Sequence, residues 1–322
     1  VIPSCILVSS ARQLQETLLP ALQALKVATT RRGEELSAVT KTGRTHLMDA
    51  MPLTFGQEMS AWVSQLEECQ QRLLAVQPRL HQLPVGGSAV GTGVNVPAGF
   101  AGRLVQRLNQ LSSLEFAVAP NAYARMAGQD VPLEYSAALR SLAVTLTKIN
   151  NDLRWMASGP LAGLAEIELQ PLQPGSSIMP GKVNPVLPEA VLMVAAEVLG
   201  NDSSVALAAQ SGSFQLNVML PLIAEKLFSS GESLSWACQA TAATIAGLKV
   251  NTDRLGATLA INPILVTALN TTIGYEAAAR IAKRSYAEQR PVIDVAAEET
   301  GMKREELETL LDPYRLTRGG SG

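Results

Sequence analysis

Apolar side chains recur every three or four residues over most of this chain, which is the spacing of helices that bury one face. Two such runs are long and unbroken, and we expect each to pack along a partner helix at a shallow angle. The first consists of Met59, Trp62, Leu66, Cys69, Leu73, Val76 and Leu80, and the second of Tyr135, Leu139, Leu142, Leu146, Ile149, Leu153 and Met156.

Shorter patterns predict further helices. One runs from about Ser9 to Arg32, where Pro20 should kink or split it because proline lacks the backbone donor. The others lie near 100–111, through Val191–Val198, and from Leu216 through Leu227 to about residue 249, with Pro221 as a candidate kink. The polar segment 41–52 ends at a proline and predicts an extended loop.

No segment shows sustained alternation with a period of two, so the fold should be almost all α, an elongated bundle of long antiparallel helices. From about residue 251 the predicted helices become shorter and charge becomes denser. We therefore predict a central long-helix domain over residues 1–253 and a small helical C-terminal domain over residues 254–322.

Composition narrows the function. The 322 residues carry a net charge of -2 and no basic stripe with interleaved aromatic residues, which argues against a nucleic-acid partner. No apolar run reaches membrane-spanning length by eye, so we expect no membrane partner. The cysteines Cys5, Cys69 and Cys238 are odd in number and far apart, which favours a reducing, cytoplasmic compartment and argues against a zinc site.

Two further features bear on processing and cofactors. The chain starts without an initiator methionine or a basic leader, so it reads as part of a longer protein without a signal peptide. Its only histidines, His46 and His81, leave little scope for a histidine-based metal site, and we expect no metal and no cofactor.

The helical pattern stops most sharply at residues 174–185, Pro-Gly-Ser-Ser-Ile-Met-Pro-Gly-Lys-Val-Asn-Pro. Glycines beside hydroxyl, amide and ammonium donors suit an anion, although an ordinary connecting loop would have a similar composition. A second glycine-rich loop, residues 86–95, follows no strand pattern and carries no phosphate-binding lysine, so we reject a nucleotide-binding interpretation.

Residues 175–185 resemble the signature of the fumarase/aspartase superfamily. Three further stretches are similar to class II fumarases in the same order, namely 43–54, 86–93 and 265–275. The resemblance covers nearly the whole chain and implies a homotetramer whose composite active sites each draw on three subunits. It also implies that an N-terminal domain precedes residue 1 and that the substrate is a small dicarboxylate.

The implied reaction is reversible anti elimination of water, which interconverts malate and fumarate. By resemblance, Ser176 is the base that removes a carbon-bound proton, and His46 binds or activates the water with Glu189 as its carboxylate partner. Lys182 and Asn184 would grip the substrate carboxylates, with Thr45 and Ser88 as further polar contacts. In a eukaryote the resemblance places such an enzyme in the mitochondrial matrix.

Two other functions stay open at this point. Three stretches resemble aspartase more than fumarase, namely residues 129–130, 186–189 and 214–219, so the chain could instead release ammonia from aspartate. Residues 121–124 depart from the usual fumarase pattern, and a non-catalytic helical assembly is the third hypothesis. His46 favours hydration, because the histidine handles the water that distinguishes this reaction from ammonia addition.

Overall fold

The computed structural model describes residues 1–319, and the last three residues of the predicted C-terminal domain lie outside them. The chain divides into two compact units, each made of three stretches of sequence. Unit 1 comprises residues 1–28, 62–154 and 171–245, and unit 2 comprises residues 29–61, 155–170 and 246–322. The boundary between residues 253 and 254 stays a prediction.

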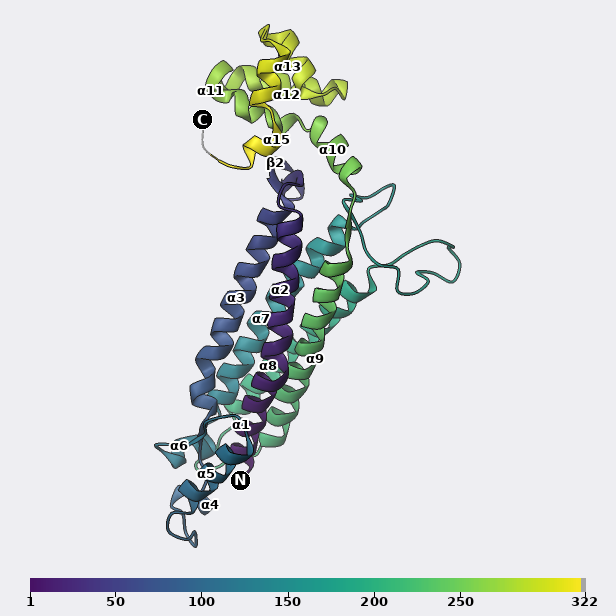
Figure 1. Cartoon of the computed structure of the whole chain (residues 1–322). Helices are drawn as coiled ribbons and strands as arrows, with labels where there is room; N and C mark the ends of the chain where they lie inside the picture. Colours follow the sequence, from purple (N-terminus) through teal and green to yellow (C-terminus); the bar gives the residue numbers. More distant parts are fainter. Residues whose placement is uncertain (320–322) are drawn as a thin grey trace. The chain divides into compact units, whose positions relative to one another are not determined.

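Long helices dominate unit 1 and lie side by side (Figure 1). Both apolar seams predicted from the sequence are buried, with no member more than 3% exposed, and their helices are confirmed. Helices that reach or lie in this unit are α1 (Ile2–Gln13), α2 (Leu19–Glu35), α3 (Phe55–Leu80), α7 (Asp130–Met156), α8 (Val186–Ala209) and α9 (Leu220–Gly247).

The first predicted helix begins earlier than expected and contains a π-helical turn, Leu14–Leu18, between α1 and α2. The backbone N–H of Leu19 donates to the carbonyl of Leu14, five residues back, just before Pro20. The wider turn accommodates a proline that cannot donate to the helix, so the predicted interruption takes this form.

Pro221 does not kink its helix, contrary to the sequence-based expectation. It is the second residue of α9, where a missing N–H costs nothing because the first turn has no intrahelical acceptor. Leu216 consequently lies before the helix rather than in it, in a turn where it bridges Ser213.

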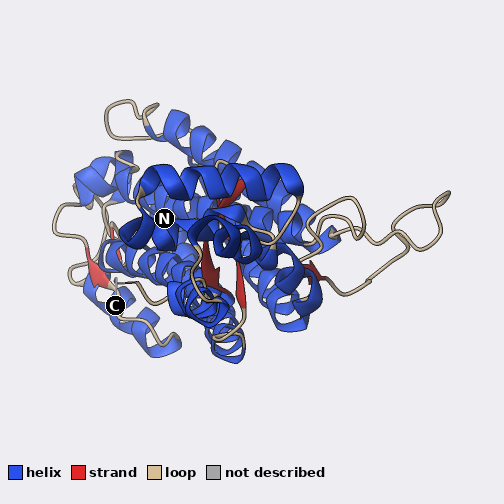
Figure 2. Ribbon diagram, turned by 90° about the horizontal axis from the view of Figure 1, so that it is seen from above, coloured by secondary structure: helices blue, strands red, loops and turns tan. Residues whose placement is uncertain are grey.

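The strands are short and occur in two-stranded pairs, as the red segments of Figure 2 show. In unit 1, β3 (Gln82–Leu83) pairs in parallel with β4 (Ala117–Val118). The connecting segments of this unit carry three shorter helices, α4 (Ser88–Gly91), α5 (Phe100–Leu111) and α6 (Ala122–Ala127).

Unit 2 contains the antiparallel hairpin of β1 (Thr40–Thr45) and β2 (Met48–Thr54), and the pair of β5 (Ile167–Glu168) with β6 (Lys249–Val250). The hairpin corrects the extended loop predicted for residues 41–52. The C-terminal helices are α10 (Thr252–Ala260), the 3-10 helix η2 (Pro263–Leu269), α11 (Asn270–Ile273), α12 (Tyr275–Glu288), α13 (Val292–Thr300), α14 (Arg304–Leu310) and α15 (Pro313–Leu316).

These C-terminal helices enclose a small core of their own. Its fully buried members include Leu269, Val295 and Leu307, one from each of η2, α13 and α14. The shorter helices predicted beyond about residue 251 are therefore present, and the almost all-α fold class is confirmed.

The expectation that no apolar run reaches membrane-spanning length is wrong for α8. By length and composition this 24-residue helix passes the criterion for a span, and within residues 1–319 a second span results if the bent pair of α10 with η2 and α11 is counted. Buried bundle helices meet the same criterion, and α8 carries the buried polar pair Asn201 and Asp202. Asp202 accepts from Ser136 at 2.7 Å and pairs with Arg140 at 2.6 Å, both on α7.

Candidate functional site

The loop 174–185 folds on itself in unit 1. The backbone N–H of Gly175 donates to the carbonyl of Lys182 at 2.9 Å, and the side-chain amide of Asn184 donates to the carbonyl of Gly175 at 2.8 Å. A Cβ at position 175 would overlap the Lys182 carbonyl, so only glycine allows this closure. Sequence composition alone indicated the bend but not these closing bonds.

Within the loop, the hydroxyl of Ser176 accepts two backbone N–H groups, from Ile178 at 3.3 Å and from Met179 at 3.1 Å. Donors that converge on a hydroxyl oxygen stabilise negative charge there. The arrangement therefore lowers the energy of a Ser176 oxyanion, which is what a serine base requires.

The remaining residues predicted for this part of the site flank the same loop. Lys182 is exposed, and within residues 1–319 no carboxylate pairs with its ammonium group. Glu189 lies in the first turn of α8, half-buried, and its side chain likewise has no ion-pair partner in the described part of the chain. Both charges are thus available to groups from outside unit 1.

Ser88 begins α4 and is exposed at the glycine-rich loop. It lines a cavity of about 450 Å³ together with Gly86, Gly87, Ala89 and Met126, all in unit 1. The backbone of Ala89 has a positive φ of 60°, which marks a sharp turn beside the serine.

Thr45 and His46 lie at the tip of the hairpin in unit 2. His46 and Leu47 form a two-residue turn between the paired residues Thr45 and Met48, with φ values of 55° and 62°. Two positive φ values in a row define the type I′ turn, in which glycine and asparagine are usual, so histidine and leucine adopt it at a cost in energy. The side chain of His46 is exposed.

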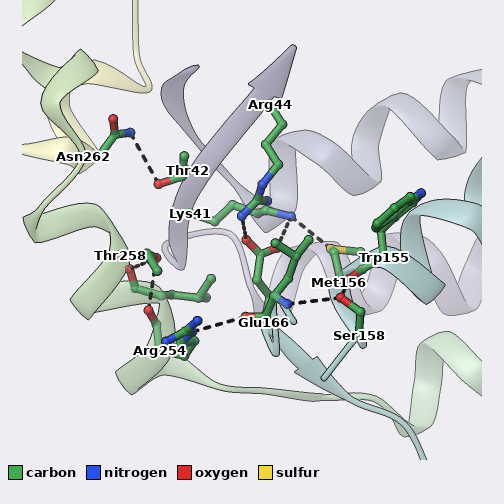
Figure 3. Close-up of polar contacts among 12 residues, drawn as sticks. Lys41, Thr42, Arg44, Trp155, Met156, Ser158, Glu166, Arg254, Thr258 and Asn262 are labelled. Atoms are coloured by element: carbon green, nitrogen blue, oxygen red, sulfur yellow. Dashed lines mark hydrogen bonds and ion pairs between the residues drawn. The ribbon is translucent and has the colours of Figure 1, made fainter. Parts of the chain in front are cut away.

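Below the tip, unit 2 holds a buried cluster of charges that the sequence did not reveal (Figure 3). The ammonium of Lys41 lies 2.9 Å from a carboxylate oxygen of Glu166 and 3.0 Å from one of Glu58. Arg44 reaches the other oxygen of Glu166 at 2.6 Å. The side chains of Lys41 and Glu166 are each 3% exposed. The only feature of the sequence that could have pointed to this cluster is Glu166 itself, a single charge in the otherwise apolar run 164–167.

The predicted site residues therefore fall into two groups. Ser88, Ser176, Lys182, Asn184 and Glu189 belong to unit 1, and Thr45 and His46 belong to unit 2. Within residues 1–319, no group of three or more histidine, cysteine, aspartate or glutamate side chains is arranged to hold a metal ion.

The other histidine, His81, packs against Phe116 with ring centroids 5.2 Å apart. Burial lowers the pKa of His81 because the charged imidazolium loses water. This residue belongs to the packing of unit 1.

Comparison with known proteins identifies the family. A lyase family profile matches residues 2–200, and one for the fumarase C C-terminus matches residues 265–318. The chain is 53% identical to class II fumarate hydratase 2 of Pseudomonas aeruginosa over 99% of its own length and 70% of that protein. It is also 53% identical to class II fumarate hydratase of Xylella fastidiosa, over 99% of this chain and 68% of that one.

A comparison with solved structures agrees with these sequence matches. The crystal structure of class II fumarase from Schistosoma mansoni superposes with a TM-score of 0.93 and 33% identity, over 98% of this chain and 69% of that one. The family profiles, the curated relatives and the solved structure agree, and the chain belongs to the class II fumarase family of lyases.

Proposed function

We propose that this chain catalyses the reversible hydration of fumarate to malate by anti addition and elimination. The observation that carries the proposal is the pair of backbone N–H groups directed at the Ser176 hydroxyl, 3.3 and 3.1 Å away. A serine is an effective base only if its oxyanion is stabilised, and preorganised donors do this without reorganisation during the reaction.

In this proposal Ser176 removes the proton from the carbon next to a carboxylate of malate. Lys182 and Asn184 hold the carboxylates. The exposed ammonium of Lys182 supports this role, because it has no ion-pair partner within residues 1–319. Asn184 donates one amide hydrogen to the loop at Gly175 and keeps the other for substrate.

Thr45, Ser88, His46 and Glu189 complete the proposed site. His46 protonates the leaving hydroxyl through the bound water, and Glu189 orients its imidazole and raises its basicity. Thr45 and Ser88 donate hydroxyl hydrogen bonds to substrate. All four side chains are exposed or half-buried, so substrate can reach them.

We further propose a homotetramer in which each site combines residues from several copies. The support is α8, which buries one face within the chain but leaves Met193 67% and Leu207 62% exposed on another. An apolar surface of this kind is stable in water when another copy covers it. Native mass spectrometry should show the tetramer, and Leu207→Asp should dissociate it; a monomeric parent protein would contradict the proposal.

We place the protein in the cytoplasm, or in the mitochondrial matrix of a eukaryote. Cys69 and Cys238 support this location, because both are free thiols buried in the helices of unit 1. Cell fractionation followed by immunodetection tests it, and recovery from an extracellular or periplasmic fraction would contradict it.

The central experiment follows fumarate by its ultraviolet absorbance, with malate and aspartate offered in parallel. We expect turnover of malate and none of aspartate, and a loss of about 100-fold or more in kcat for Ser176→Ala, since positioned acid–base groups contribute that much. The matched control is Ser177→Ala, the adjacent exposed hydroxyl, which should retain activity. Production of fumarate from aspartate alone would identify an ammonia-lyase instead.

A further inference from the structure

The buried ion cluster of unit 2 has no part in the chemistry described so far, yet it lies at the base of the strand that carries Thr45 and His46. We propose that Glu166 is a positioning residue, which pairs with Lys41 and Arg44 and thereby holds the hairpin tip in the geometry that His46 needs. The expected effect on kcat rests on the proposed hydration reaction. The anchoring of the hairpin by Glu166 does not depend on that reaction.

Glu166 is suited to act as a fixed anchor because its own backbone is clamped on both sides. Its N–H donates to the carbonyl of Met156 at 2.8 Å, and its carbonyl accepts from the N–H of Asn251 at 2.9 Å. The next two residues form β5, paired with β6. A carboxylate on so constrained a segment cannot follow its partners if they move.

The two cations that Glu166 binds lie three residues apart on β1. In a regular strand such residues point to opposite faces, yet both reach the same carboxylate, at 2.9 Å from Lys41 and 2.6 Å from Arg44 (Figure 3). The pairing register shifts between Thr42 and Arg44, and a Cβ on the intervening Gly43 would lie 2.5 Å from the Met51 carbonyl. Such irregularities re-aim side chains.

The position of Arg44 makes the pairing relevant to the tip. Arg44 directly precedes Thr45 and His46, so displacement of its backbone displaces both. The tip also has two consecutive non-glycine residues at positive φ, a conformation that persists only where the surroundings impose it. Glu166 supplies such a constraint at one end of the hairpin.

A second contact constrains the other strand. Asn262, buried at the start of η2, donates from its side-chain amide to the carbonyl of Ala50 at 3.0 Å. The same amide also donates to the hydroxyl of Thr42 on β1, at 3.5 Å (Figure 3). Both bonds are neutral, whereas the Glu166 contacts are ion pairs with side chains of β1. The two anchors therefore use different side chains and different kinds of contact, and each can be removed without removing the other.

The charges in the cluster balance, since Lys41 and Arg44 face Glu58 and Glu166. The ring of Phe55 also lies 4.7 Å from the Lys41 ammonium, and the Met156 sulfur 3.0 Å from it. Of the two cations, Glu58 forms an ion pair with Lys41 and not with Arg44. Replacing Glu166 by glutamine therefore keeps the shape of the site but leaves Arg44 without its anion within the described residues.

The experiment compares Glu166→Gln with Glu168→Gln, an exposed glutamate two residues along on β5. Steady-state kinetics with malate and fumarate should show kcat about 100-fold lower in Glu166→Gln with a smaller change in KM, because a displacement of about 1 Å at a catalytic group costs that much. The pH profile of kcat should change in the limb that reports His46. Glu168→Gln should resemble the parent protein in all of these.

Hydrogen exchange measured by mass spectrometry reports on the hairpin independently of turnover. Amides of residues 44–49 should exchange at least about tenfold faster in Glu166→Gln, while those in the cores of α3 and α7 stay unchanged. If Glu166→Gln does not fold, Glu166→Asp keeps the charge at a shorter reach and should show the same changes in weaker form.

The outcomes separate the two proposals. A parent protein that turns over neither malate nor fumarate would overturn the proposed function, while faster exchange at residues 44–49 in the variant would still support the anchoring. A folded variant with parental kcat, pH profile and hairpin exchange would overturn the positioning role of Glu166. A variant whose stability falls while kcat and the pH profile stay parental would assign Glu166 to folding alone.

Discussion

The hairpin 40–54 and the loop 174–185 both carry residues proposed for the active site, but they are held in opposite ways. The hairpin rests on buried charges, with Lys41 and Glu166 each 3% exposed, and on a buried asparagine from η2. The loop is held by hydrogen bonds among its own residues, at 2.8 and 2.9 Å, and its side chains are mostly exposed.

This difference matches the role proposed for each group. A histidine that transfers protons to a bound water needs a fixed position, because proton transfer is sensitive to distance. A loop that surrounds a substrate carboxylate must let the substrate enter and leave, and lid-like loops come from the less stable parts of a protein. The comparison leads to four predictions.

The largest expected effect is on the buried anchor. Lys41→Met removes one partner from a buried ion pair and should lower the free energy of unfolding by about 3–5 kcal/mol, since the remaining carboxylates lose a compensating charge. Urea denaturation measures it. The matched control is Arg31→Met, whose ion pair with Glu35 is on the surface, with the arginine side chain 81% exposed. That change should cost less than about 1 kcal/mol.

Equal losses in these two variants would show that the buried cluster does not stabilise the hairpin more than a surface pair does. The contrast between hairpin and loop would then have no energetic basis.

The second effect falls on activity rather than stability. Gly175→Ala places a Cβ against the Lys182 carbonyl and should open the loop, lowering kcat/KM about tenfold or more, equivalent to about 1.4 kcal/mol of barrier. The free energy of unfolding should change little because the loop lies outside the helical core. In Gly102→Ala, where a Cβ meets nothing within 4 Å, both quantities should stay near parental values. Parental kcat/KM in Gly175→Ala would mean that loop closure is not needed.

A third effect is kinetic. Trypsin can cut after Lys182 in the loop and after Arg44 in the hairpin, and the protease must first bind a locally unfolded segment. Limited proteolysis followed by mass spectrometry should therefore detect cleavage after Lys182 well before cleavage after Arg44. Cleavage in the reverse order would contradict the proposed difference in rigidity.

The smallest effect concerns pH and the second histidine. Burial depresses the pKa of His81 from its usual value near 6.5, so the unfolded chain binds the proton more tightly. His81 therefore contributes stability that is present above about pH 6.5 and is lost as pH falls toward the lower folded pKa. Urea midpoints at pH 7 and 5 should differ less in His81→Gln than in the parent.

Sequence patterns predicted the helical core well because helix periodicity reports burial directly. The residues of both seams proved to be buried, with none more than 3% exposed. The signature 175–185 and the stretch around His46 likewise pointed to a fumarase-like chain, and the family comparison agrees. The hairpin was missed because Thr40–Thr54 contains a register shift and a strained turn, which obscure the alternation expected of strands.

By itself, the sequence determined the all-α class, the two long seams and the family, because each depends on residues that are close together or regularly spaced. Only the tertiary structure decided which charges are buried together. Glu166 lies more than a hundred residues along the chain from Lys41 and Arg44, and its place in a short apolar run does not say which cations it meets. Their pairing depends on the backbone hydrogen bonds that hold residue 166 beneath the hairpin, and periodicity carries no information about those contacts.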